Sequence, residues 1–175
     1  MDAKQWKEKL LREPKNGYDR LGAEEREAMT AYCEDYKAFL DVGKTERECV
    51  TEGIRLAEAR GFRPYKRGME LKSGDKVYVN NRGKMLLLAV IGRKGLAEGV
   101  QIAAAHIDSP RLDLKPNPLY EDSELAYLKT HYYGGIRKYQ WVTIPLELRG
   151  VVALADGSTV RVAIGEGDEP KLVIS

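Results

Sequence analysis

The first sixty residues carry apolar side chains at the spacing of helices. Residues 4–12 form a short amphipathic stretch that ends before Pro14. In residues 23–42 the apolar positions recur every three or four residues, so this stretch predicts a longer helix with Cys33 on its buried face. Thr45 followed by Glu48 is the pattern of a capping box and predicts a third helix that continues to about residue 60.

After Pro64 the pattern changes to that of short strands. Residues 76–79 and 84–91 flank the turn sequence Asn-Asn-Arg-Gly, which predicts a β-hairpin. The run 86–91 is continuously apolar, as expected of a strand covered on both faces, and the alanine-rich run 100–107 predicts a second buried strand. Helices followed by strands that are covered on both faces favour an α/β layer sandwich.

From Trp141 onward the pattern predicts several short strands and no helix. The expected strands cover residues 142–148, 150–154 and 159–164, and Asp156-Gly157 has the sequence of a hairpin turn between the last two. We interpret this β-rich stretch as a separate module that the chain enters at Gly134-Gly135.

The predicted division therefore places residues 1–135 in an α/β domain and residues 136–175 at the start of a β-rich domain. Residues 171–175 have the pattern of a further strand at the end of the chain. A strand without a following partner leads us to expect a truncated or split protein.

Composition narrows the classes of function. The 175 residues are 43% hydrophobic, and 29 Lys and Arg residues against 27 Asp and Glu give a net charge of +2 without a block of like charge. We therefore expect neither a nucleic-acid partner nor a membrane surface. The longest apolar run, residues 85–91, is too short to span a bilayer, and no signal peptide opens the chain. Cys33 and Cys49 lack CxxC spacing and indicate reduced thiols, so a cytoplasmic location is expected.

His106 and Asp108 are the candidate site. If residues 100–107 form a strand, positions 106 and 108 share a face, and the carboxylate of Asp108 can accept a hydrogen bond from one imidazole nitrogen. That bond would fix the tautomer and leave the other nitrogen free to bind a metal. The alternative is a structural His–Asp pair without a metal, because the chain's other histidine, His131, lies in no recognisable ligand pattern. Spacing alone leaves both interpretations open.

A longer stretch of sequence resembles a known family. The residues from His106-Ile-Asp-Ser-Pro-Arg onward, and Leu128-Lys-Thr-His-Tyr-Tyr-Gly-Gly-Ile-Arg-Lys-Tyr-Gln-Trp after them, resemble bacterial M18 aminopeptidases. The hairpin Tyr78-Val-Asn-Asn-Arg-Gly-Lys and the run Val142-Thr-Ile-Pro-Leu resemble the same family. Arg111 departs from relatives outside the bacterial subgroup.

The resemblance implies a function and a site. M18 enzymes are metallo-aminopeptidases with two zinc ions, whose α/β catalytic domain is interrupted by a β-rich domain used to assemble large homo-oligomers. The resemblance implies that His106 ligates zinc, that Asp108 orients this histidine, and that the substrates are peptides; members of the family commonly prefer an acidic first residue. The family's other ligands and its catalytic glutamate lie downstream of the matched region. We therefore expect this chain by itself to be inactive.

The chain also allows a function that is not enzymatic. Without the remaining ligands, it could serve as an assembly or interaction module that uses the β-rich stretch from Trp141. His131 is expected to be a polar strand residue before the glycine turn, and Gly134-Gly135 lacks the spacing of a nucleotide-binding loop.

Overall fold

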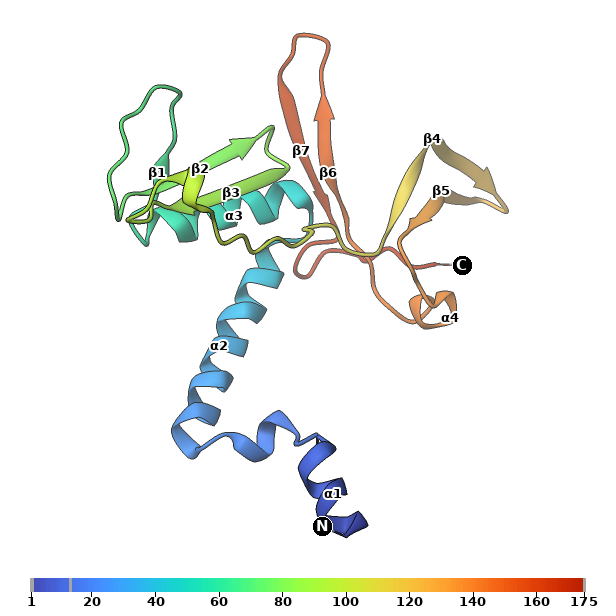
Figure 1. Ribbon diagram of the computed structural model, residues 1–175. Helices are drawn as coiled ribbons and strands as arrows, with labels where there is room; N and C mark the ends of the chain where they lie inside the picture. Colours follow the sequence, from blue (N-terminus) through green and yellow to red (C-terminus); the bar gives the residue numbers. More distant parts are fainter. Residues whose placement is uncertain (1, 13, 175) are drawn as a thin grey trace. The chain divides into compact units, whose positions relative to one another are not determined.

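The computed structural model describes residues 2–12 and 14–174 as a mixture of helices and short strands (Figure 1). The contacts group into two units, Met1–Asp41 and Val42–Ser175. Among the described residues, no helix has both the length and the apolar character needed to cross a membrane. The mixed α/β class predicted from the pattern is confirmed.

The first unit is helical. Helix α1 (Ala3–Leu10) begins with a complete capping box, in which Asp2 and Gln5 each accept a hydrogen bond from the other's backbone N–H. A 3₁₀ turn (Gly17–Arg20) leads to helix α2 (Ala23–Val42). Both helices were predicted, but the burial of Cys33 is wrong: no residue of α2 is buried, and Cys33 is exposed. The apolar residues of α2 have the period of a packed face, but most of them lie exposed in the described chain.

The second unit begins with the elements that form its small core. Helix α3 (Glu46–Glu58) packs on a three-stranded sheet in the order β1 (Arg63–Pro64), β2 (Lys76–Asn81) and β3 (Met85–Val90). The β2–β3 hairpin is antiparallel, as predicted, and β1 pairs with β2 in parallel. The buried apolar residues come from α3 and β2; they are Val50, Ala57, Val77 and Tyr78. Gly53 allows the close approach of helix and sheet, because a Cβ there would lie 2.9 Å from Leu86 Cδ2.

The predicted burial of the next strands is wrong. Neighbouring residues of a strand point to opposite faces, and Leu87 and Leu88 of β3 are 50% and 49% exposed, so both faces of β3 are partly open. Residues 100–107 form no strand at all, and Ile102 is 82% exposed. A strand is stabilised by a neighbouring ladder, and in the described chain the backbone of 100–107 has no such neighbour.

A long hairpin that the sequence analysis did not predict follows this segment. Strands β4 (Arg111–Asp122) and β5 (Leu125–Tyr133) pair antiparallel, and the turn residues Ser123 and Glu124 both have positive φ. Two central residues with positive φ match the twist that a two-residue hairpin turn needs. The register shifts between Leu114 and Leu119, where two prolines interrupt β4 and cannot donate ladder hydrogen bonds.

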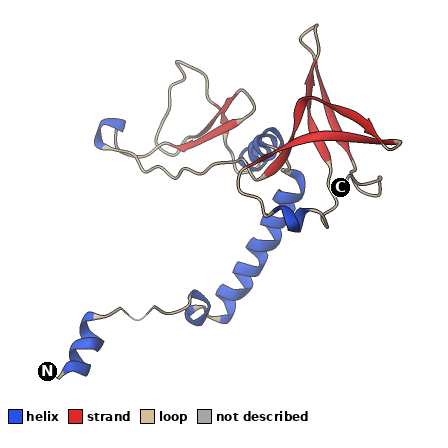
Figure 2. Cartoon of the chain, turned by 90° about the vertical axis from the view of Figure 1, so that its right-hand side faces the viewer, coloured by secondary structure: helices blue, strands red, loops and turns tan. Residues whose placement is uncertain are grey.

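The β-rich C-terminal stretch is partly as predicted (Figure 2). A short helix, α4 (Lys138–Trp141), leads into the paired strands β6 (Leu148–Ala153) and β7 (Thr159–Ile164). The Asp156-Gly157 turn is confirmed, with φ of 85° at Gly157 and a 2.8 Å bond from the Ser158 N–H to Asp156 Oδ1.

Two further strands of that stretch were predicted wrongly. The expected strand over 142–148 and the expected strand over 171–175 reduce to one isolated bridge between Leu146 and Leu172; Ser175 lies outside the described residues. Each segment holds one paired position rather than a ladder, because the short turns around residues 141–144 and 165–169 interrupt the extended backbone.

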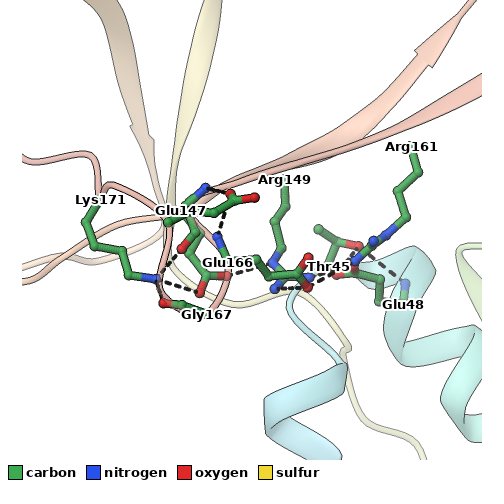
Figure 3. Close-up of polar contacts among 10 residues, drawn as sticks. Thr45, Glu48, Glu147, Arg149, Arg161, Glu166, Gly167 and Lys171 are labelled. Atoms are coloured by element: carbon green, nitrogen blue, oxygen red, sulfur yellow. Dashed lines mark hydrogen bonds and ion pairs between the residues drawn. The ribbon is translucent and has the colours of Figure 1, made fainter.

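A network of charged side chains connects α3 to the β6–β7 hairpin (Figure 3). Arg149, whose side chain is 10% exposed, lies 3.1 Å from Glu48 Oε1 and 2.8 Å from oxygens of Glu147 and Glu166. Arg161 also contacts Glu48 Oε1, at 3.1 Å. The Thr45 hydroxyl accepts the helix-capping bond from the Glu48 N–H, so half of the predicted capping box is present.

The Glu48 side chain joins these arginines instead of closing the capping box. Burial by itself raises the pKa of this carboxyl, but hydrogen bonds from Arg161, Arg149 and Thr45 outweigh it, so the pKa is lowered. A carboxyl with a lowered folded pKa stabilises the fold above its unfolded pKa, and this contribution is lost as pH falls through the folded value.

Replacing Glu48 by Gln is therefore expected to lower the free energy of unfolding by about 1–2 kcal/mol at neutral pH, because the carboxylate that accepts from Arg149 and Arg161 becomes an uncharged amide. The difference from the parent should shrink as pH falls below about 4, the ordinary glutamate range. Urea unfolding at several pH values measures this. Glu34→Gln, which removes an exposed pair with Lys37 on α2, is the matched control. Equal pH dependence in parent and Glu48→Gln would contradict the expectation.

Candidate functional site

His106 lies in an irregular segment at the edge of a hollow of about 400 Å³. Its side chain is 80% exposed, so the imidazole is open to solvent and to other groups. The hollow collects residues from α3, from the β2–β3 hairpin, from the irregular segment and from β5; they are Glu46, Lys84, Met85, Leu86, Ala105, His106, Ile107, Asp108 and Tyr133.

The imidazole of His106 contacts Asp108 through two oxygens. Its Nδ1 lies 2.8 Å from the Asp108 backbone oxygen and 3.3 Å from Oδ1 of the same residue. Both oxygens accept hydrogen bonds, so this contact requires the proton of a neutral imidazole on Nδ1 and leaves a lone pair on Nε2. The predicted proximity is present, but the irregular backbone of this segment produces it and not the shared face of a strand. The role in metal binding stays a prediction.

Tyr133, at the end of β5, holds the Asp108 carboxylate from the other side. Its hydroxyl donates to Asp108 Oδ2 at 2.9 Å. This hydrogen bond is the main reason that the pKa of Asp108 lies below the ordinary aspartate value. The same bond, together with the negative charge of Asp108, raises the pKa of Tyr133. Asp108 is therefore ionised at neutral pH and is shared by an imidazole and a phenol.

Arg111, the first residue of β4, fixes the ring of Tyr133. The guanidinium carbon lies 4.1 Å from the centre of the Tyr133 ring, which is a stacking contact between a cation and an aromatic face. Arg111 Nε donates to Asp113 Oδ1 at 2.7 Å, and Nη1 lies 3.3 Å from Glu46 Oε1 of α3. The hydrogen bond to Asp113 is the chief cause of the raised pKa of Arg111.

The residues present fit one position of a metal site and not a whole site. A protein zinc site uses three or four protein donors. Across residues 2–12 and 14–174, no three His, Cys, Asp or Glu side chains come close enough to hold a metal ion together. His106 can supply one neutral imidazole nitrogen with its tautomer fixed by Asp108, and a complete site of three donors needs at least one donor from outside the described residues.

His131 lies apart from this arrangement in the β4–β5 hairpin. It belongs to β5, pairs with Asp113 across the hairpin, and stacks on the Tyr132 ring with 5.3 Å between ring centres. The prediction of a strand residue before a glycine turn is confirmed, since Gly134 follows with φ of 74°. A Cβ at Gly134 would make an ordinary contact with Pro110, 3.4 Å from its Cα, so the positive φ and not a lack of space favours glycine here.

Sequence reasoning missed Tyr133 and Glu46 as members of the site. The missing step was the hairpin: Arg111 pairs with Tyr133 in the ladder, and Asp108 stands only three residues before Arg111. A prediction of that register would have placed the Tyr133 hydroxyl near Asp108.

Comparison with known proteins identifies the family. Residues 39–174 match the family described as aminopeptidase I zinc metalloprotease (M18). A probable M18 family aminopeptidase 1 of Clostridium acetobutylicum is 53% identical over 163 residues, which are 91% of this chain and 35% of that protein. The Thermotoga maritima protein of the same description is 43% identical over 148 residues, or 82% of this chain and 32% of that protein.

Solved structures agree with this match. The crystal structure of aminopeptidase I from Borrelia burgdorferi B31 superposes with a TM-score of 0.84 at 40% identity, covering 91% of this chain and 40% of that one. Aminopeptidase I from Clostridium acetobutylicum gives 0.77 at 49% identity, covering 95% and 38%. The chain thus spans about a third of the length of the curated relatives it matches. On these matches, it belongs to the M18 family of zinc metalloprotease aminopeptidases.

Proposed function

We propose that this chain contributes one zinc ligand, His106, and the carboxylate that orients it, Asp108, to the active site of an M18 aminopeptidase. The observation that supports the proposal is the exposed imidazole at the hollow, with Nδ1 directed at Asp108 and the Nε2 lone pair left available. A histidine buried among apolar side chains would have spoken against a ligand role.

The chemistry of the complete site follows from the metal. Bound zinc lowers the pKa of water and polarises a carbonyl oxygen, which is what peptide-bond hydrolysis requires. The part that this chain plays is electrostatic and positional. The negative charge of Asp108 favours a cation bound to His106. Its hydrogen bond with Nδ1 holds the ring of His106 in the tautomer whose Nε2 can bind the metal.

The substrates we propose are peptides with a free amino terminus, including those with an acidic first residue. We further propose that residues 1–135 belong to the catalytic α/β sandwich and that residues 136–175 begin a β-rich domain used in assembly into homo-oligomers. Both proposals follow from membership of the family. The paired strands β6 and β7 are compatible with the second proposal.

The proposal is tested in a chimera in which residues 1–174 replace the matching part of the Clostridium acetobutylicum relative, which supplies the remaining two thirds of the family's length. The chimera should bind zinc and release amino-terminal residues from peptides. His106→Gln should lower its zinc affinity at least about 100-fold and abolish hydrolysis, because loss of a direct ligand costs more than loss of a ligand's hydrogen-bond partner. Metal analysis and an aminopeptidase assay measure the two effects.

His131→Gln is the matched control for that experiment, since it removes the other histidine and should leave both quantities unchanged. Asp108→Asn should weaken zinc binding about 10–100-fold, the usual cost of losing the partner that orients a ligand. Unchanged zinc content and activity in His106→Gln would refute the ligand assignment. An inactive chimera that still assembles would favour the alternative of an assembly module.

The chain by itself should not hydrolyse peptides. The described residues bring no three metal-binding side chains together, and one imidazole binds zinc too weakly at neutral pH to hold a catalytic ion. Incubating the purified 175-residue chain with zinc and a set of peptides should release no amino-terminal residue above the metal-only blank. Sustained release that is lost in His106→Gln would show that the chain completes a site alone.

A further inference from the structure

The segment that carries His106 has very few hydrogen bonds to the rest of the second unit. Residues 100–109 form no helix or strand. Among the described residues, the hydrogen bond from the Tyr133 hydroxyl to Asp108 Oδ2 is the only one that ties 100–109 to another element. The other bond in this segment, between His106 Nδ1 and the Asp108 backbone oxygen, is internal to it.

The bond from Tyr133 positions both oxygens of Asp108 that face the imidazole, the carboxylate Oδ1 and the backbone oxygen. With Oδ2 held by Tyr133, Oδ1 is directed at Nδ1, 3.3 Å away. The Asp108 backbone oxygen belongs to the same residue, so fixing the side chain also restricts where this oxygen lies. Removing the phenol hydroxyl frees the carboxylate to rotate and releases the backbone of the segment from β5. The imidazole then loses the geometry that selects one tautomer.

Tyr133 is itself held in place by Arg111. Arg111 stacks on one face of its ring, and the guanidinium is fixed by Asp113 within β4 and by Glu46 in the first turn of α3. A planar guanidinium with two carboxylate partners has few orientations available. The contacts therefore form a continuous series from Glu46 on the helix to His106 at the hollow.

We propose that Tyr133 is a positioning residue for His106: through Asp108 it holds the imidazole in the Nδ1–H tautomer, and the Arg111 stack holds Tyr133. The effect of Tyr133 on zinc binding rests on the ligand role proposed above for His106. The positional claim concerns the metal-free chain and is measured without zinc.

The test is nitrogen NMR of the imidazole rings in the metal-free 175-residue chain, at a pH where the rings are neutral. The chain has two histidines, so His131→Gln assigns the signals. In the parent, the Nδ1 and Nε2 signals of His106 should be widely separated, as one tautomer requires. In Tyr133→Phe they should move toward each other, because two tautomers then interconvert. Asp108→Asn should change the same signals.

Tyr132→Phe is the matched control, because it removes one hydroxyl from the adjacent residue of β5, whose ring stacks on His131 and lies under Lys138. It should leave the His106 ring signals unchanged. A parent-like His106 spectrum in Tyr133→Phe would overturn the proposal. If Tyr133→Phe does not fold, the test is made by NMR on the parent chain. Through-space contacts from Tyr133 ring protons to Asp108 support the proposal, and their absence overturns it.

The outcomes separate this inference from the function on which it builds. If Tyr133→Phe changes the His106 tautomer but His106→Gln leaves zinc binding in the chimera intact, the positional inference stands and the ligand role fails. If zinc binding needs His106 but Tyr133→Phe leaves the His106 tautomer unchanged, the ligand role stands and the inference fails. In the chimera, Tyr133→Phe should weaken zinc binding by no more than Asp108→Asn does, about 10–100-fold, since it acts through Asp108.

Discussion

The antiparallel pairing of β4 with β5 determines where the candidate ligand lies. The pairing sets Arg111 opposite Tyr133, and the chain immediately before Arg111 is then carried past the end of β5. Gly134, directly after β5, has φ of 74°, a backbone conformation that residues with a Cβ rarely adopt. Asp108 comes within reach of the Tyr133 hydroxyl because of this pairing, and His106 is fixed in turn. An irregular segment thus acquires a defined geometry from a ladder to which it does not belong.

The sequence predicted helices α1, α2 and α3 but not the short helix α4, and it predicted the hairpin β2–β3, the hairpin β6–β7 and the pair His106–Asp108. These features depend on neighbours close in sequence: caps, a period of three to four, turn residues and a two-residue spacing. The β4–β5 hairpin escaped prediction because its turn, Ser123-Glu124, is not one of the usual glycine-containing pairs and because prolines interrupt β4. Tyr133 was missed as a consequence, since only the register of that hairpin brings it to Asp108.

The remaining errors share one physical cause. Continuous apolar runs indicate that a segment is suited to burial, but burial also needs a covering surface. Residues 100–107 and the faces of β3 have the composition of buried strands and lie exposed in the described chain. Cys33 is a further example, because it lies on the apolar face of helix α2 and is exposed. The sequence pattern therefore identified the apolar side chains of these segments correctly but predicted their burial incorrectly.

The two prolines in the middle of β4 have a consequence for how the chain behaves at high concentration. Exposed strands with apolar side chains invite pairing with strands of other molecules, which begins aggregation. Proline has no backbone N–H, so β4 lacks two of the donors that a foreign strand would need there. The shift in register between Leu114 and Leu119 breaks the ladder at the same place. The longest hairpin of the molecule is thereby a poor template for intermolecular sheet growth.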